Sequence, residues 1–229
     1  MNVYRHLLVP ALLTSAALTM GAPAGARVSA PTHPLIVALG DSITYGWLLP
    51  EPATQNYAAL YADRVGVDIV NLAVPGYTCA QVRLRLSKMP PGATTVILNC
   101  GTNDIGGFGA ERGGVPNGHH RIAPATRTAL LAAEKDFRDI VSIVRRKEPY
   151  ARIIAVTVRR WQRMTAPEDR RFVEDIIAWN TMVLTAPVHP VDISRDPRMY
   201  DPAYIQPDLI HPNVDGNSAI ADDVYAVAH

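Results

Sequence analysis

The chain has 229 residues, of which 48% are hydrophobic and 19% are charged. This length allows one globular domain with a sizeable core and is short for two. The net charge of +1 argues against an electrostatic nucleic-acid binder, so we expect no nucleic-acid partner. Two cysteines exclude both a disulfide-dense scaffold and a four-cysteine zinc site.

The first 26 residues predict a secretory signal peptide. A basic start at Arg5 and His6 precedes an apolar stretch, Leu7–Met20, and small residues follow with an Ala-x-Ala pattern. The apolar stretch is shorter than the roughly 20 residues of a membrane span, which favours export and cleavage over a permanent anchor. We therefore expect a secreted protein in which residues 27–229 form a single domain, with no membrane span after cleavage.

Export changes the interpretation of Cys79 and Cys100, because an oxidising compartment allows two cysteines to join. Closing this loop would stabilise the fold by about 3 kcal/mol. Spacing alone fixes no geometry, so two buried free thiols are the alternative.

Short apolar segments rich in β-branched residues recur along the chain, bounded by Gly, Pro, Asp or Asn. They predict strands buried on both faces, at Leu35–Leu39, Val67–Ala73, Thr95–Asn99, Ile153–Val158 and Val188–Ile193. Between and after them lie stretches with helical spacing, at Asn56–Val65, Ala80–Met89, Thr126–Lys147, Glu168–Leu184 and Asn213–Val227. In the longest stretch, the apolar stripe includes Leu130, Leu131 and Phe137. This alternation predicts a five-stranded parallel sheet with helices on both faces and ligands at the carboxyl ends of the strands.

A candidate nucleophile and its base lie in two loops of this scheme. Ser42 follows the first predicted strand, in Gly40-Asp41-Ser42-Ile43-Thr44. A serine hydroxyl needs a base to take its proton, and His211 with Asp208 supplies one. Their spacing of three puts both side chains on one face of a helical turn, so the carboxylate can hold the imidazole toward Ser42. Taken singly, Ser42 is explained as well by a helix cap and His211 by a surface position.

Two further loops supply candidate oxyanion donors. Gly76 follows the second predicted strand, and glycine lets a backbone N–H approach a ligand closely. Asn103, in Gly101-Thr102-Asn103-Asp104, offers an uncharged amide N–H pair. Each residue taken singly also fits ordinary turn chemistry.

Together, the four segments resemble, in order, the sequence blocks of the SGNH subgroup of GDSL-type esterases and lipases. The matching residues are Gly40–Thr44, Gly76, Gly101–Asp104 and Asp208–His211. Ile43 stands where the family name has leucine, a change that removes no reacting atom. The similarity runs from about Leu35 to Val227.

The resemblance implies a flavodoxin-like three-layer α/β/α fold and a carboxylic ester hydrolase that needs no metal or organic cofactor. It implies Ser42 as nucleophile with His211 and Asp208, and an oxyanion hole made by the Ser42 and Gly76 N–H groups and the Asn103 side chain. The substrate would be a small-molecule or polysaccharide ester. Only a modest apolar surface is visible near the site, which favours short-acyl or carbohydrate O-acetyl esters over lipase-like substrates.

Other interpretations and contacts follow from the same segments. An α/β-hydrolase would need Gly-x-Ser-x-Gly, but Thr44 stands two residues after Ser42. A non-catalytic carbohydrate-binding module on the same fold is the alternative, and the complete Ser-His-Asp set argues against it. The candidate substrate contacts are Trp47, after the first predicted strand, and Arg159 and Trp161, after the fourth. The glycine-rich segment Ile105–Pro124 follows Asn103 and should border the site. The sequence leaves acyl length, the alcohol and the oligomeric state open.

Overall fold

A computed structural model describes residues 33–106, 125–160 and 170–229 of the chain. The predicted signal peptide, Trp161 and residues 107–124 of the glycine-rich segment lie outside these residues.

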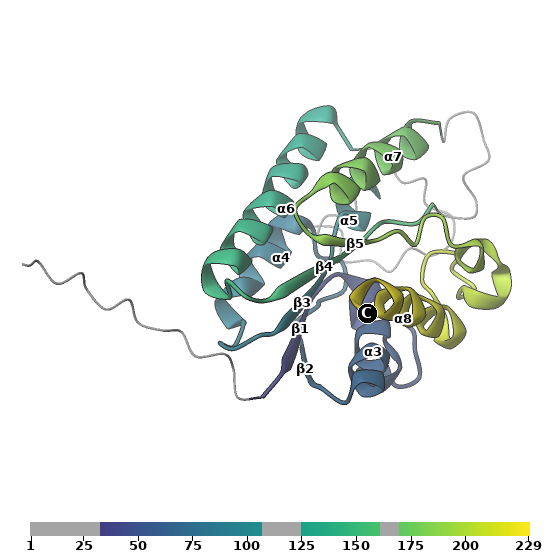
Figure 1. Ribbon diagram of the computed structural model, residues 1–229. Coiled ribbons are helices and arrows are strands. Elements are labelled where there is room, and N and C mark those ends of the chain that lie inside the picture. The colour runs from purple at the N-terminus through teal and green to yellow at the C-terminus, as the bar shows by residue number, and fades with distance from the viewer. Residues whose placement is uncertain (1–32, 107–124, 161–169) are drawn as a thin grey trace, which may run out of the picture. The chain divides into compact units, whose positions relative to one another are not determined.

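Within the described residues, parallel strands form a single five-stranded sheet in the order β2-β1-β3-β4-β5 (Figure 1). The strands are β1 (Leu35–Gly40), β2 (Asp68–Asn71), β3 (Thr95–Asn99), β4 (Arg152–Val156) and β5 (His189–Val191). This flavodoxin-like order confirms the predicted fold class.

The strand order places the switch point of the sheet beside β1. In β1, Ile36 pairs with Ile69 of β2 on one side and with Thr95 of β3 on the other. The loops after β1 and β3 therefore leave neighbouring strands at the carboxyl edge. That is where open α/β sheets bind their ligands.

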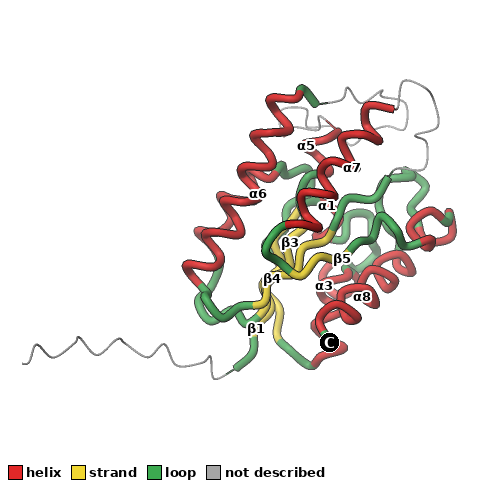
Figure 2. The backbone as a smooth tube through the Cα atoms, turned by 45° about the horizontal axis from the view of Figure 1, so that its top comes forward, coloured by secondary structure: helices red, strands yellow, loops and turns green. Residues whose placement is uncertain are grey.

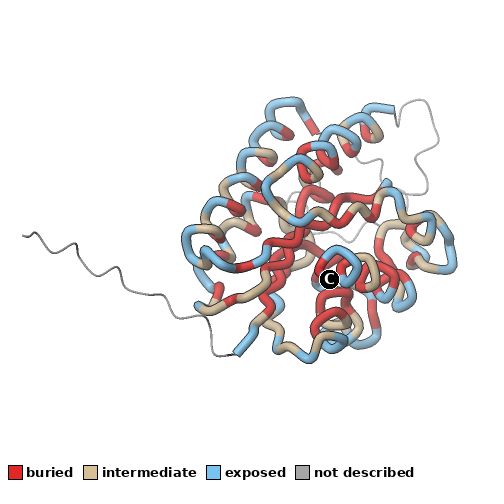
Figure 3. The backbone as a smooth tube through the Cα atoms, in the orientation of Figure 1, coloured by how far each residue is buried: buried red, intermediate tan, exposed pale blue. Residues whose placement is uncertain are grey.

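Helices cover both faces of the sheet, as predicted (Figures 1 and 2). One face carries α3 (Tyr57–Val65) and α8 (Val214–Ala228), and the other carries α4 (Cys79–Arg85), α6 (Arg127–Lys147) and α7 (Arg170–Thr185). Alternate β1 residues serve the two layers, because successive side chains of a strand point to opposite faces. Figure 3 shows the helices exposed along their outer sides, and the central strands β1, β3 and β4 are largely buried. The edge strands β2 and β5 are only partly buried, so the expectation that all five strands are buried on both faces is wrong for these two, because an edge strand has a neighbour on one side only.

The long helix α6 shows how its sequence determines its packing. The Thr126 side chain accepts the N–H of Ala129 at 3.2 Å and caps the first turn. Buried apolar residues then recur at helical spacing, at Leu130, Ala133, Phe137, Ile140, Val141 and Val144. Leu131, predicted on this stripe, is 48% exposed, since it lies one residue and therefore about 100° away from Leu130.

Short elements were not predicted. These are α1 (Ser42–Tyr45), α2 (Pro52–Gln55), α5 (Thr102–Gly106) and the 3₁₀ turns η1 (Leu86–Lys88), η4 (Pro197–Tyr200) and η5 (Pro202–Tyr204). None exceeds five residues, which is too short to show helical periodicity. The predicted strands at β2, β4 and β5 each extend two residues into the loop that follows.

Of the two cysteine alternatives, the structure contains the disulfide. Cys79, at the start of α4, is bonded to Cys100, directly after β3, and both residues are buried. Among the described helices, none combines the length and apolar character needed to cross a bilayer.

Candidate active site

The loop after β1 holds Ser42 at the first position of α1. Asp41 caps this short helix, because its Oδ1 accepts the N–H of Ile43 at 2.9 Å. Gly40 has no room for a side chain, since a Cβ there would lie 2.3 Å from Thr44 Oγ1 and 2.7 Å from Asn99 O. The Asp41 cap and the close packing around Gly40 therefore both hold the turn that carries Ser42.

Asp41 is completely buried beside this turn. Burial raises the pKa of its carboxyl to about 6, against the lowering effect of the Ile43 N–H. The nearby His211 also favours the ionised form. A titratable carboxyl is thus held next to the candidate nucleophile.

Ser42, His211 and Asp208 lie in one hydrogen-bonded line, as the sequence predicts. His211 Nε2 is 2.8 Å from Ser42 Oγ, and His211 Nδ1 is 2.5 Å from Asp208 Oδ2. Partial burial raises the pKa of Asp208, but the hydrogen bonds from the His211 ring and main chain outweigh it, so the net pKa is lowered. Asp208 is therefore a carboxylate at neutral pH and orients the imidazole toward the serine.

A closed turn, rather than the expected helical turn, brings Asp208 to His211. Asp208 Oδ1 accepts the N–H groups of Ile210 and His211 at 2.9 and 3.0 Å. Between them, Leu209 has a φ of +64°, a left-handed conformation that is unfavourable for leucine. The ends of the turn meet where the Gln206 N–H donates to His211 O at 2.7 Å. We refer to residues 205–212 as the Asp-His turn.

The two candidate oxyanion loops adjoin this arrangement. Val74 N–H donates to Gly40 O at 3.1 Å, which attaches the loop after β2, where Gly76 lies, to the end of β1. Gly76 has a φ of +80° that favours glycine, although a Cβ would meet open space. Asn103 Nδ2 donates to Tyr77 O at 2.9 Å, and this bond uses one of the two N–H groups of the amide.

The Asn103 loop is held from behind by Gly101 and Asp104. Gly101 has a φ of +115°, and a Cβ there would lie 2.3 Å from the buried indole of Trp179. Asp104 Oδ2 accepts the N–H of Cys79 at 3.0 Å, and burial raises the pKa of Asp104 to about 6. The loop is thus tied to α7 and to α4.

The three residues predicted to contact substrate lie in different environments. Trp47 is half-buried directly after α1, and its main-chain N–H donates to the main-chain carbonyl of Ser42 at 3.0 Å. Arg159 is 3% exposed, and its guanidinium donates to main-chain carbonyls, so the structure does not support it as a substrate contact. Trp161 lies outside the described residues. No three His, Cys, Asp or Glu side chains come together as a metal site in the part of the chain described.

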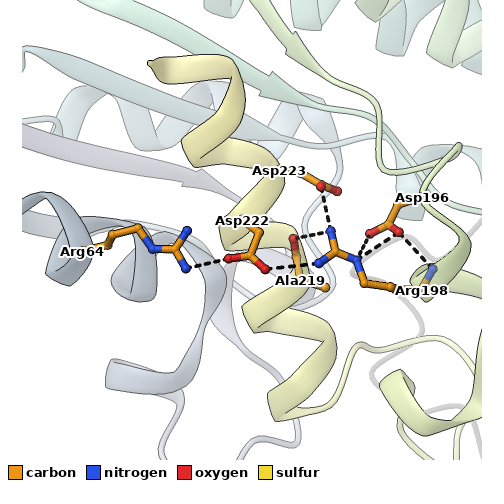
Figure 4. A network of polar contacts seen from close by, with 6 residues as sticks. All are labelled: Arg64, Asp196, Arg198, Ala219, Asp222 and Asp223. Carbon is orange, nitrogen blue, oxygen red and sulfur yellow. Dashed lines mark hydrogen bonds and ion pairs between the residues drawn. The ribbon is translucent and has the colours of Figure 1, made fainter.

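A charged network holds the segment before the Asp-His turn to the rest of the protein (Figure 4). Arg198, in η4, donates to Asp196, Asp222 and Asp223 at 2.8 to 3.1 Å. Asp222 also pairs with Arg64 at 2.6 Å, so α3, α8 and η4 are joined through one carboxylate.

The supporting roles of several residues were not predicted from the sequence. Gly40 and Gly101 are steric requirements, and their position at strand ends was the available signal. Asn180 of α7 accepts the Val158 N–H at 2.9 Å and donates to Val158 O at 2.7 Å. A polar residue on the buried stripe of an amphipathic helix was the signal for Asn180.

Solved structures that are similar to the chain share this fold. A phospholipase A1 from Streptomyces albidoflavus matches with a TM-score of 0.64 at 16% identity, covering 84% of this chain and 98% of that one. An acetyl xylan esterase matches with a TM-score of 0.60 at 16% identity, covering 85% and 100%. A carbohydrate esterase family 2 enzyme with a carbohydrate binding domain, from Corynascus thermopiles (Myceliophthora fergusii), matches with a TM-score of 0.62 at 19% identity. That match covers 87% of this chain but 66% of the other, slightly less than two thirds.

Sequence comparison gives the family directly. No curated protein matches the chain. The model of the GDSL-like lipase/acylhydrolase family, however, matches residues 38–219, which include all four segments on which the predicted resemblance rests. The chain therefore belongs to the GDSL-like lipase/acylhydrolase family and is a carboxylic ester hydrolase.

Proposed function

We propose that Ser42 is the nucleophile of a Ser-His-Asp triad and forms an acyl-enzyme with the substrate. The observation that carries this proposal is the 2.8 Å contact between His211 Nε2 and Ser42 Oγ. His211 accepts the hydroxyl proton as Ser42 attacks the ester carbonyl, and then protonates the leaving alcohol. A water molecule, deprotonated by His211, releases the acid. Asp208 stabilises the imidazolium formed in each half-reaction.

The oxyanion formed at the carbonyl is held by three donors in this proposal. These are the main-chain N–H groups of Ser42 and Gly76 and the second N–H of the Asn103 amide. The hydrogen bond from Asn103 to Tyr77 supports the assignment, because it orients the amide beside the Gly76 segment. Donors oriented before the reaction are worth more than mobile ones.

We propose short-acyl or carbohydrate O-acetyl esters as the substrate class. The acetyl xylan esterase and the carbohydrate esterase among the similar structures support this choice. Among the described residues that follow Ser42 in the same loop, the large exposed apolar side chains are Tyr45 and Leu48, at 39% and 48% exposure, which is little surface for a long acyl chain. The similar phospholipase A1 favours lipid esters as a second candidate.

A panel of p-nitrophenyl acetate, butyrate and palmitate, with acetylated xylan, tests the reaction and the substrate class together. We expect the acetate ester and acetylated xylan to be hydrolysed best, and Ser42→Ala to abolish turnover without unfolding the protein. Preference for palmitate would favour the lipid alternative. Binding of xylan without hydrolysis of any ester would indicate the non-catalytic module and would overturn the triad assignment.

We also propose that the protein is exported and cleaved after its first 26 residues. The basic and apolar N-terminal sequence and the buried disulfide support export, since disulfides persist in oxidising compartments. N-terminal sequencing of protein collected outside the cytoplasm should begin near Arg27. A start at Met1 would contradict cleavage.

A further inference from the structure

The Asp-His turn is held by a buried arginine from another strand. Arg159 lies three residues after β4, at the carboxyl edge of the sheet, and is 3% exposed. Its Nη2 donates to Leu209 O at 2.7 Å and to Ile210 O at 2.6 Å, and its Nε donates to Ile210 O at 3.2 Å. These carbonyls belong to the two residues that separate Asp208 from His211.

The same guanidinium reaches a second segment. Its Nη1 donates to Met199 O at 3.3 Å, in η4, and to Arg160 O at 3.2 Å. The network around Arg198 anchors η4 to α8 (Figure 4). Arg159 therefore joins the Asp-His turn to an anchored part of the fold.

The turn needs such support, because its conformation is strained. Leu209 is held at a φ of +64°, which costs a leucine free energy relative to ordinary backbone. Its carbonyl and the next one point at the same guanidinium nitrogen. A planar fork of N–H donors can satisfy several carbonyls at once, whereas a lysine ammonium cannot reproduce that geometry.

The backbone that carries Arg159 is itself fixed. Both main-chain polar groups of Val158 bond to the Asn180 side chain, at 2.9 and 2.7 Å. Asn180 is buried on α7. Support thus runs from α7 through Val158 to Arg159 and on to the Asp-His turn.

We propose that Arg159 is a positioning residue that sets the register of Asp208 and His211 against Ser42, and that it does not bind substrate. This inference rests on the proposed triad. Displacing a catalytic group by about 1 Å can cost on the order of 100-fold in rate. Loss of the guanidinium contacts should therefore lower turnover and leave substrate affinity unchanged.

The test compares Arg159→Lys with Arg145→Lys on p-nitrophenyl acetate. Arg145 is the matched control, because its guanidinium also donates to main-chain carbonyls, of Ala151 and Pro187, but before β4 and β5 at the opposite edge of the sheet. We expect R159K to lower kcat by roughly 10- to 100-fold with KM within about twofold. R145K should keep the wild-type kcat at temperatures where both variants are folded by circular dichroism.

A spectroscopic measurement reports the same positioning without turnover. The Nδ1 proton of His211, shared with Asp208, should give a far-downfield proton NMR signal in the wild type and in R145K. It should shift or broaden in R159K. Asn180→Ala, which leaves the guanidinium itself unchanged, should lower kcat in the same direction by a smaller factor, and it serves if R159K does not fold.

The outcomes separate this inference from the proposed function. A raised KM with unchanged kcat in R159K would restore the substrate-contact interpretation and overturn the proposal. Unchanged kcat, KM and NMR signal would overturn it as well. A wild-type protein that hydrolyses no ester, or one whose activity survives Ser42→Ala, would instead overturn the triad on which the inference rests.

Discussion

Cys79 and Cys100 are joined by a disulfide, and each lies three residues from a proposed oxyanion donor, Gly76 on one side and Asn103 on the other. The bond therefore ties together the two loops that should hold the oxyanion. The Cys79 N–H donates to Asp104 Oδ2, which adds a second tie between the same loops.

Removing the disulfide should weaken both the fold and the reaction. The bond closes a loop with a sequence separation of 21, for which chain entropy gives about 3 kcal/mol. We expect Cys79→Ala/Cys100→Ala to lose roughly this free energy of unfolding in urea titrations, and to lower kcat because Gly76 and Asn103 are less fixed. Reductant should shift the wild type toward the double variant and leave the double variant unchanged. Full activity in the fully reduced wild type would contradict the link to the oxyanion loops.

The buried carboxyl of Asp104 predicts a pH dependence of stability. Burial raises its pKa in the folded protein to about 6, so the folded state holds the proton more tightly than the unfolded state. Its stabilising contribution is therefore complete below about pH 4 and is lost as the pH rises through about 6. In the wild type, ionisation of Asp104 should lower the free energy of unfolding by up to about 3 kcal/mol between pH 4 and pH 7. Asp104→Asn cannot ionise, so its free energy of unfolding should decrease less over this pH range.

Asp139, partly exposed on α6, gives a control of opposite sign. The hydrogen bond from Lys135 lowers the pKa of Asp139, so its contribution is lost as the pH falls. Asp139→Asn should leave the slope between pH 4 and pH 7 as in the wild type. An equal slope in the Asp104 variant and the wild type would show that Asp104 does not contribute to this pH dependence.

Two glycines with positive φ should respond differently to alanine. Gly66, which ends α3 with a φ of +65°, faces open space, so Gly66→Ala should cost about 1 kcal/mol for the backbone conformation alone. At Gly101 the added Cβ would also collide with Trp179. We expect Gly101→Ala to cost roughly 3 to 5 kcal/mol and to lower kcat by displacing Asn103. Similar melting temperatures for the two variants would contradict this packing.

The fold and the candidate site residues could be predicted because each leaves a local signal. The five strands are short apolar segments between turn residues, and Ser42, Gly76 and Asn103 each follow one of them. The turn type between Asp208 and His211 could not be predicted, because it depends on Leu209 adopting a positive φ, and leucine gives no such signal.

The role of Arg159 is the main revision to the sequence-based interpretation. Its place after a strand predicted its position at the carboxyl edge of the sheet, but a sequence does not tell which way a long side chain turns. Its direction is decided by long-range contacts with Leu209 and Ile210, which lie 50 and 51 residues further along the chain. The same reason explains why Gly101 was predicted as part of a loop and not as a steric fit to Trp179.

The most direct test of the triad is covalent labelling with a fluorophosphonate, followed by mass mapping of the modified peptide. We predict one adduct per chain on Ser42, none in Ser42→Ala, and labelling slowed by at least about 100-fold in His211→Ala, because the serine has then lost its base. Labelling of a different residue, or wild-type labelling rates in the His211 variant, would contradict the account.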